Sequence, residues 1–316
     1  MSEVITLSYV VTTYNKYSYL QQVLGTLITN CKADEEIIVI DGGSTDGTKE
    51  LLEAFYKEGK IHHLSSQKDY GEAHGFNKGI LLAKGELIKI ITDDDVFDHE
   101  VIQTCKKYMF ENKTVDILFA NISSINTRQN RGDLLFAKSY ETWFREWQSG
   151  LIKNCFVCGL SILLRRTTLP YIGLFDTSFK HIDVEYTVRI TSKKVNVTFY
   201  TGLMVAAVMN ADSISHVSGA MVHDEIRRVS DYYNYTYPIG VMTAAPQIHD
   251  RSLKGRIMRK LRQKPKVQPT YYPDYNYTLQ KELNTSNFLQ LYQNLAVVIK
   301  NYNKMNKTEF IECIKY

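Results

Sequence analysis

Long hydrophobic runs are absent from this 316-residue sequence, and cysteine and tryptophan are scarce. No apolar stretch reaches the ~18 residues of a membrane-spanning helix, which predicts a chain without one. The five cysteines are odd in number and scattered, and no second pair or histidine completes a zinc site with Cys155 and Cys158, so neither a disulfide framework nor a zinc site is indicated. The N-terminus has no basic cluster typical of a secretory signal. We therefore expect a cytoplasmic protein.

The composition is that of a globular protein with a mild positive charge. Hydrophobic residues make up 44% of the chain and charged residues 23%, and the formal net charge is +4. A chain of this length is expected to form one large domain with an appendage, because single domains much beyond ~250 residues tend to split. The change in character near residue 230 predicts a domain at 1–230 and an extension at 231–316.

Strand-like and helix-like segments alternate through the first hundred residues. The second strand-like segment, Glu36 to Asp41, is continuous in Ile and Val, as expected for a strand buried on both faces. The expected strands are 5–12, 36–41, 61–65 and 86–92, and the expected helices are 17–30, 48–57 and 72–83. This alternation predicts an α/β fold with a mainly parallel sheet flanked by helices, whose ligand site lies at the carboxyl ends of the strands.

Three consecutive aspartates, Asp93, Asp94 and Asp95, follow the fourth expected strand. Like charges this close are costly unless a cation offsets them, so the run indicates a divalent metal site. An acidic turn or a helix start is the alternative interpretation, because aspartate is common in both.

The polar residues that follow three of the strands are expected to meet at one edge of the sheet. The first strand ends at Thr12, Tyr14 and Asn15, the second at Asp41, and the fourth at the aspartate run. An aromatic ring can stack on a base, a carboxylate can accept from a base N–H or a ribose hydroxyl, and a carboxylate-bound metal can bridge a diphosphate. The edge therefore predicts a nucleoside diphosphate site, although loop packing alone would also explain Thr12 and Tyr14.

Several short segments in order resemble family 2 glycosyltransferases of the GT-A fold. In the first hundred residues these are 11–16, 40–48, 69–73, 77–79, 83–86 and the aspartate run; beyond them are 161–166, 173–176 and 183–185, with Arg189. The resemblance covers about residues 4 to 220. It implies a Rossmann-like GT-A domain with a donor half at about 1–100 and an acceptor half at about 101–230, followed by a helical C-terminal extension.

The resemblance also implies an activity: inverting transfer of a sugar from a nucleoside-diphosphate sugar, helped by Mn²⁺ or Mg²⁺. Asp94 best matches the metal-contacting position, with Asp93 and Asp95 beside it, and Thr92 stands where the family usually has Asp or Asn. Which two of the three aspartates contact metal, sugar or ribose stays open. The donor-binding residues carried over are Thr12, Tyr14, Asn15, Asp41, Lys68, Asp69 and Asp93, and the metal ligands are Asp94 and Asp95. UDP is the favoured carrier, because a carboxylate at Asp41 can accept from the N3–H of uracil.

The catalytic base implied by the resemblance is Asp183. Ile182 occupies the place where many members have the Glu of a Glu-Asp pair, which leaves Glu185 as the alternative base. A solvated helix face paired with Arg189 is the non-catalytic interpretation of both acids. His216 follows a strand-like segment at which GT-A enzymes can supply a further metal contact, although a lone histidine is more often structural.

The extension contains a strongly basic segment, 251–266, with eight basic residues and no acid. Leu253, Ile257 and Leu261 recur at i, i+4 and i+8 within it, which favours peripheral contact with the inner face of an anionic membrane. A solvated basic helix is the alternative, and no nucleic-acid partner is expected because no nucleic-acid-binding module accompanies the segment. The apolar tail that follows is expected to pack on the domain or to mediate self-association.

The function predicted from these observations is sugar transfer to a hydroxyl of a glycan or a lipid-linked acceptor in cell-surface polysaccharide synthesis. Two alternatives come from other classes. A sugar-phosphate nucleotidyltransferase would also use metal-binding carboxylates, but the loop from Thr12 to Lys16 lacks the expected phosphate-binding glycines. A non-catalytic nucleotide-sugar-binding subunit would be expected to have lost the metal ligands or the base.

Overall fold

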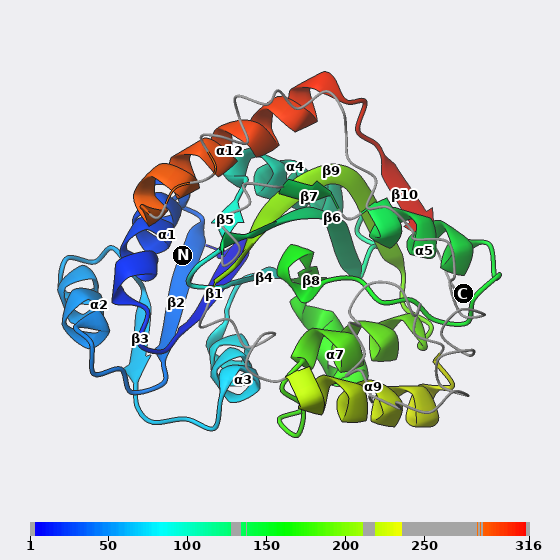
Figure 1. The fold of residues 1–316 in the computed structure, drawn as a ribbon, viewed down its shortest axis with the longest axis horizontal. Coiled ribbons are helices and arrows are strands. Elements are labelled where there is room, and N and C mark those ends of the chain that lie inside the picture. The colour runs from blue at the N-terminus through cyan, green and yellow to red at the C-terminus, as the bar shows by residue number, and fades with distance from the viewer. Residues whose placement is uncertain are drawn as a thin grey trace, which may run out of the picture.

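The computed structural model describes residues 4–127, 134–136, 138–210, 219–235, 283, 285 and 287–313, without the side chains of 135, 136, 138, 139 and 219–223. A central sheet is flanked by helices (Figure 1). The strands are β1 Leu7–Thr13, β2 Glu35–Asp41, β3 His63–Ser66, β4 Leu87–Ile91, β5 Val96–Phe97, β6 Ile117–Asn126, β7 Leu134–Phe136, β8 Leu163–Arg165, β9 Val197–Met209 and β10 Phe310–Cys313. The helices are α1 Tyr17–Asn30, α2 Thr48–Lys57, α3 Glu72–Leu82, α4 His99–Glu111, α5 Lys138–Gln148, α6 Leu169–Ile172, α7 Ile182–Thr191, α9 Gly219–Tyr233 and α12 Phe288–Met305.

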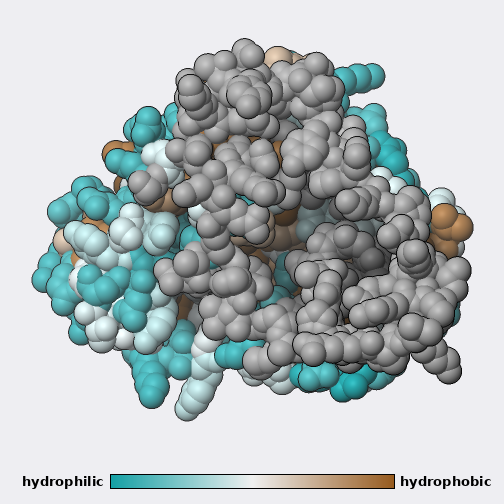
Figure 2. All heavy atoms as spheres, in the orientation of Figure 1, coloured by the Kyte–Doolittle hydropathy of each residue, from teal (hydrophilic) through white to brown (hydrophobic). Residues whose placement is uncertain are grey.

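The main path of the sheet runs β10-β9-β6-β8-β4-β1-β2-β3. β1 pairs in parallel with β2 and β4, and β2 pairs in parallel with β3, so the prediction of parallel βαβ units is confirmed for the first four strands. The rest of the sheet is mixed: β8 is antiparallel to both of its neighbours, whereas β6 and β9 are parallel. Hydrophilic side chains cover the outer surface around α2 (Figure 2).

The C-terminal part of the chain completes the sheet. α12 crosses α1, where the Tyr19 and Phe288 rings meet edge to face with centroids 4.7 Å apart. β10 then pairs antiparallel with β9, a strand that the sequence analysis did not anticipate in its helical extension. Residues 251–266 lie outside the described residues. In the described part of the chain, no helix combines the length and apolar content needed to cross a bilayer.

Lys89 is a charged residue type in the middle of the buried strand β4. Its side chain is 0% exposed, and its Nζ donates to the carbonyl oxygens of Ile90 at 2.9 Å and Leu160 at 2.5 Å. Burial lowers the pKa of Lys89 to about 7, against weaker opposing effects of Cys158, Cys105 and Asp95. In the folded protein this amine therefore releases its proton around neutral pH, well below the pH at which an exposed lysine does.

Lys89→Met is expected to flatten the pH dependence of stability. Between about pH 7 and pH 10.5 the unfolded chain holds a proton at Lys89 that the folded chain has released, so the free energy of unfolding rises with pH across this window. Denaturant unfolding at about pH 7 and about pH 9 should show a smaller rise for Lys89→Met than for the wild type. Lys84→Met, at an exposed site, is the matched control and should keep the wild-type rise. Equal rises in all three proteins would contradict the assignment.

Candidate functional site

The ends of β1, β2 and β4 lie side by side, as expected for neighbouring parallel strands. In the pairing register, Thr13 stands opposite Asp41 and Val11 opposite Ile91. The loop after β1 and the aspartate run after β4 therefore leave the sheet at the same edge. This edge is where ligands bind in open α/β sheets.

Asn15 joins the loops that follow β1 and β2. Its backbone N–H donates to Ser44 Oγ at 2.8 Å, and its side-chain Oδ1 accepts from the Thr45 N–H at 2.8 Å. The residue has a positive φ of 52°, a conformation that asparagine tolerates better than most residues. In this structure the Asn15 side chain holds the two loops together, and its predicted role in donor binding stays a prediction.

Asp41 is 0% exposed, and both of its carboxylate oxygens accept hydrogen bonds. Oδ1 accepts from Ser44 Oγ at 2.5 Å and Oδ2 from Ser66 Oγ at 2.6 Å, and the Ser44 N–H donates to both. A carboxylate has about four acceptor positions, and these four contacts occupy them, so a base N–H would have to replace one of the contacts. The contacts seen here fix the turn after β2.

The other residues predicted to bind the donor lie around the same edge. A Cβ added to Gly75 would stand 3.0 Å from Thr12 Cγ2 and 3.3 Å from Asp69 Oδ2, which places these two side chains next to each other. The backbone of Lys68 packs against Gly43, where a Cβ would come within 3.0 Å of the Lys68 nitrogen. Tyr14 is 59% exposed, so its ring face is accessible to a ligand. The structure thus brings these predicted residues together, without testing their roles.

The aspartate run has an internal cation. Lys16 Nζ lies 2.9 Å from Asp94 Oδ2, and the same oxygen accepts from Asn210 Nδ2 at 2.7 Å. Burial lowers the pKa of Lys16, but the carboxylates of Asp94 and Asp93 outweigh burial and leave that pKa above its usual value. Asp94 is therefore held by contacts from two distant parts of the chain.

The pKa values of Asp93 and Asp95 reflect the repulsion between neighbouring carboxylates in the aspartate run. Burial and the neighbouring Asp94 raise the pKa of each carboxyl to about 7. Asp95 Oδ1 accepts from the Val208 N–H at 2.7 Å, and its Oδ2 accepts from Thr92 Oγ1 at 2.5 Å. Asp95 thus fastens the run to β9, and this part of the site carries more negative charge than Lys16 alone offsets.

The donor set fits a hard divalent cation in its chemistry. Such ions take carboxylate oxygens, and Mg²⁺ is usually held by one or two carboxylates together with substrate phosphates. A cation here would also lower the raised pKa values of Asp93 and Asp95. Within the described part of the chain, His, Cys, Asp and Glu side chains form no group of three or more arranged to hold a metal by themselves. His216, predicted as a further ligand, lies outside the described residues.

Asp183 and Glu185 occupy the first turn of α7 but have different surroundings. Asp183 Oδ2 accepts from the Gly159 N–H at 3.3 Å, and burial raises the pKa of Asp183 against the weaker opposing effect of backbone hydrogen bonds. Glu185 is ion-paired with Arg189 through contacts of 2.8 and 2.9 Å, and it accepts from the Tyr233 hydroxyl at 2.7 Å. Of the two acids, Asp183 has the surroundings of a proton acceptor, and the assignment of the base stays a prediction.

Glu72, the first residue of α3, is a site residue that the sequence analysis missed. Burial raises the pKa of Glu72 to about 8, and Asp183, Asp93, Asp94 and Asp95 add to the shift. The charges of the aspartate run and of Asp183 therefore both act on Glu72. The only signal in the sequence was its position within the motif segment 69–73, which supports the family resemblance but does not indicate a role.

The family model for glycosyl transferase family 2 matches residues 8–172, more than half of the chain. The chain belongs to glycosyl transferase family 2. The matched segment contains the carboxyl ends of β1, β2 and β4 together with the aspartate run, which we call the donor edge, and it ends before α7. The family match therefore does not extend to Asp183, the candidate base.

Glycosyltransferase GlyG of Streptococcus pneumoniae is 34% identical over 122 residues, which cover 38% of this chain and 40% of GlyG. Chondroitin synthase of Pasteurella multocida is 25% identical over 113 residues, which cover 36% of this chain and 12% of the synthase. The chain therefore spans less than half the length of either relative.

Solved structures show the same fold as this family 2 chain. S. aureus TarS 1–349, in complex with UDP-GlcNAc, superposes with a TM-score of 0.54 at 18% identity, covering 72% of this chain and 66% of that one. The mannosyltransferase PcManGT of Pyrobaculum calidifontis, in complex with GDP-Man and Mn²⁺, gives 0.55 at 15% identity, covering 95% and 88%. The predicted GT-A type fold is confirmed.

Proposed function

We propose that this chain is an inverting, metal-dependent glycosyltransferase that moves a sugar from a nucleoside-diphosphate sugar to an acceptor hydroxyl. The observation that carries the proposal is that Asp183 lies against the strand that ends in the aspartate run: it accepts from the Gly159 N–H, and Lys89 of β4 donates to the next carbonyl, that of Leu160. The aspartate run is suited to hold a cation that binds the diphosphate, and Asp183 is suited to accept a proton. A sugar bound between them would have its leaving group and its nucleophile on opposite sides.

The chain's own residues supply the acid–base step. An acceptor hydroxyl is a poor nucleophile until it loses its proton, and Asp183 is proposed to accept that proton as the new glycosidic bond forms. The raised pKa of Asp183 makes it a stronger base than an exposed aspartate. Attack from the side opposite the leaving diphosphate inverts the anomeric carbon. Asp94 and Asp95, with Asp93 beside them, would hold the cation, which, when bound, stabilises the charge that grows on the leaving diphosphate.

The proposed donor is a UDP-sugar. Tyr14 is exposed and follows Thr13, which stands opposite the buried Asp41, and an aromatic ring with a carboxylate suits uracil. One structural neighbour was solved with UDP-GlcNAc and another with GDP-Man, so the fold itself accommodates either carrier.

The proposed acceptor is a glycan or a lipid-linked glycan in the synthesis of a cell-surface polysaccharide. Chondroitin synthase and hyaluronan synthase of Pasteurella multocida are among the relatives, and both names describe polysaccharide synthesis. Peripheral contact of the basic segment 251–266 with the inner face of the cell membrane stays part of this proposal.

Calorimetry with nucleotides tests the donor assignment. UDP is expected to bind more tightly than ADP by about 1–3 kcal/mol, because adenine has no ring N–H to pair with the Asp41 carboxylate. dTDP and dADP form the matched control pair, since both lack the 2′-hydroxyl and only thymine keeps the N3–H, so dTDP should bind more tightly than dADP by a similar margin. Equal affinities for UDP and ADP would contradict the assignment.

A further inference from the structure

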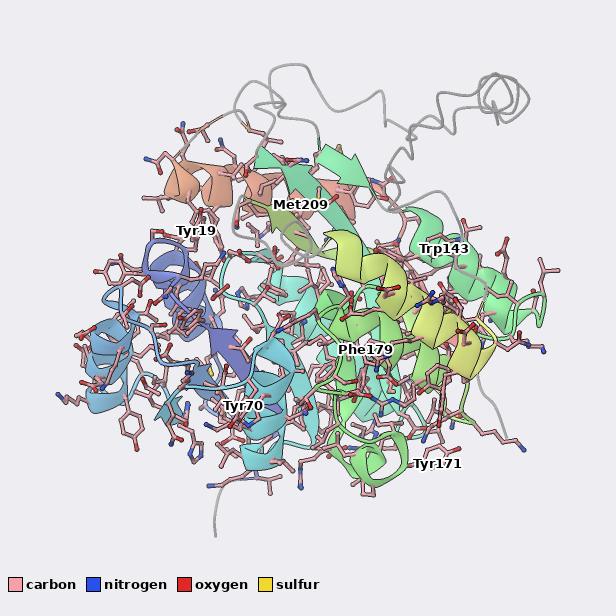
Figure 3. All side chains as sticks on the ribbon, turned by 60° about the horizontal axis from the view of Figure 1, so that its bottom comes forward. Tyr19, Tyr70, Trp143, Tyr171, Phe179 and Met209 are labelled. Atoms are coloured by element: carbon pink, nitrogen blue, oxygen red, sulfur yellow. The ribbon has the colours of Figure 1, made fainter. Side chains whose placement is uncertain are left out.

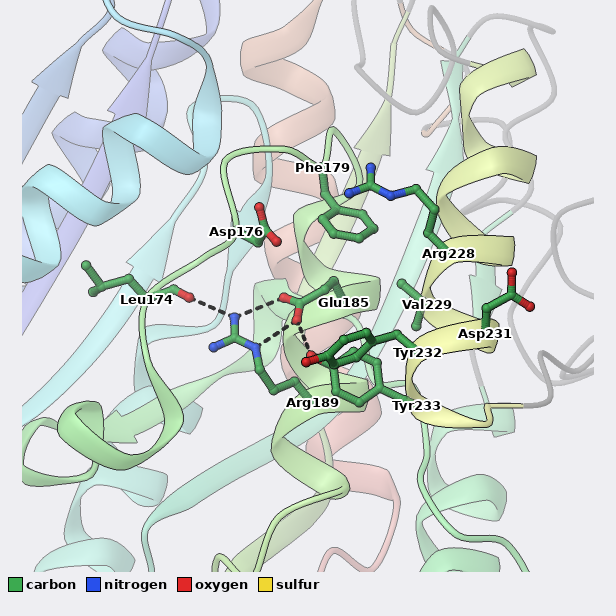
Figure 4. Close-up of a pocket in the computed structure, with 10 residues that line it drawn as sticks. All are labelled: Leu174, Asp176, Phe179, Glu185, Arg189, Arg228, Val229, Asp231, Tyr232 and Tyr233. Carbon is green, nitrogen blue, oxygen red and sulfur yellow. Dashed lines mark hydrogen bonds and ion pairs between the residues drawn. The ribbon is translucent and has the colours of Figure 1, made fainter.

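A cavity of about 770 Å³ lies between α7, the loop before it and α9, and neither the donor edge nor Asp183 lines it (Figure 4). Its walls are fixed to each other, because Glu225 of α9 accepts from the backbone N–H groups of Lys180 and His181 at 2.7 and 2.9 Å. A cavity of this size with rigid walls can hold one or two sugar rings.

The floor of the cavity is a closed network of charges. Glu185 is 4% exposed and binds both Arg189 and the Tyr233 hydroxyl. Arg189 also donates to the Leu174 carbonyl oxygen at 2.7 Å. Because the charges of these groups neutralise each other, the floor is a rigid polar surface, and a ligand bound to it needs no charge.

The mouth of the cavity combines aromatic rings with carboxylates. Tyr232 is 81% exposed, and the guanidinium of Arg228 lies 4.2 Å from the centroid of the Phe179 ring (Figure 4). Phe179 itself lies beside α9 (Figure 3). Asp176 and Asp231 also line the cavity and are exposed. Aromatic faces pack against the C–H faces of sugars, and carboxylates accept from their hydroxyls. A free phosphate would meet Arg228 but also both aspartates, so a neutral polyol fits better.

The cavity lies on a different side of α7 from Asp183. The two acids of the first turn, Asp183 and Glu185, are two positions apart, which corresponds to about 200° around a helix. Asp183 faces Gly159, whereas Glu185 faces α9. A ligand in the cavity would thus be separated from the reacting hydroxyl by the width of one helix.

We propose that the cavity between α7 and α9 binds a sugar unit of the acceptor that is remote from the hydroxyl that reacts. This proposal rests on the proposed function, since it extends the acceptor from a single hydroxyl to an oligosaccharide. The cavity would select acceptors long enough to reach around α7. Short acceptors, which cannot occupy it, would then be used less efficiently.

An array of bacterial polysaccharide fragments, followed by saturation-transfer NMR with the best-bound fragment, tests the proposal on the full chain. Tyr232→Ala and Asp231→Asn are each expected to weaken that binding at least tenfold, and Tyr232→Phe should restore it because the ring is kept. Tyr56→Ala is the matched control, since Tyr56 is also an exposed tyrosine but lies on α2. Thermal unfolding confirms that every variant is folded.

The outcomes separate the two proposals. If no fragment binds the wild-type chain, if Tyr232→Ala binds as well as wild type, or if inorganic phosphate displaces the fragment, the cavity proposal is overturned. UDP affinity is measured in parallel on the wild-type chain. A chain that binds fragments through Tyr232 but binds no nucleoside diphosphate would overturn the proposed function and leave the sugar site standing.

Discussion

Asp94→Ala is expected to abolish sugar transfer, with a loss of at least ~100-fold, while the protein stays folded. Asp94 lies at the centre of the aspartate run, and its Oδ2 is the oxygen contacted by both Lys16 and Asn210. Without the Asp94 carboxylate, the proposed cation loses a principal ligand, and Lys16 loses its ion-pair partner. Removal of divalent ions with EDTA should have the same effect on the wild-type protein, and added Mn²⁺ should restore only the wild type. The measurement is release of the nucleoside diphosphate from a nucleotide sugar.

Glu53→Ala is the matched control for this experiment, because Glu53 is a half-exposed acid on α2, far along the chain from the run. It should retain wild-type turnover and the same response to EDTA. Full activity of the wild type in EDTA, or of Asp94→Ala at any metal concentration, would show that the aspartate run has another role.

Asp183→Asn is expected to reduce transfer by ~100-fold or more while leaving donor affinity unchanged. The amide keeps the shape of the side chain and can still accept from the Gly159 N–H, but it cannot accept the acceptor's proton. Transfer is measured with a nucleotide sugar and an acceptor, and donor affinity by calorimetry with the nucleoside diphosphate. Asp224→Asn, at an exposed ion pair with Arg227, is the control and should behave as wild type.

Glu185→Gln separates the two candidate bases. It removes one side of the buried ion pair with Arg189, so the expected result is a lower thermal unfolding midpoint with transfer retained where the protein is folded. If Asp183→Asn keeps full transfer and Glu185→Gln loses it, the base assignment is wrong. If donor binding collapses in Asp183→Asn, this residue belongs to the nucleotide site.

The first half of the fold could be predicted because its signals are local. The apolar runs of β1, β2 and β4 and the spacing of α1 and α2 predict elements whose ends agree with the structure within two residues. Parallel neighbours place their carboxyl ends at one edge of the sheet. For this reason the sequence alone was enough to group Thr12, Asp41 and the aspartate run.

The rest of the fold depends on contacts between distant residues. β9 pairs with β6, β5 and β10, and β10 comes more than 100 residues after β9. No periodicity within β10 identifies its partner, because strand pairing over such distances is decided by packing. The same holds for Asn210, which reaches Asp94 from the end of β9.

At the site, residue types were easier to predict than their contacts. Asn15 and Asp41 were predicted to bind the donor, and this stays a prediction; what the sequence did not indicate is that their side chains also hold the loops that form the edge. A carboxylate or amide in a turn satisfies nearby N–H and O–H groups first. Glu72 was missed for the opposite reason, since its significance depends on Asp183, which is more than 100 residues away in sequence.

The most direct test of the central claim is to incubate the full chain with Mn²⁺ and a panel of UDP-, dTDP-, GDP- and ADP-sugars without acceptor, and to measure slow release of the nucleoside diphosphate. The account predicts metal-dependent release from at least one UDP-sugar, and loss of that release in Asp94→Ala. A folded wild-type chain that releases nucleotide from no sugar in the panel, or releases it equally with and without a divalent ion, would contradict the account.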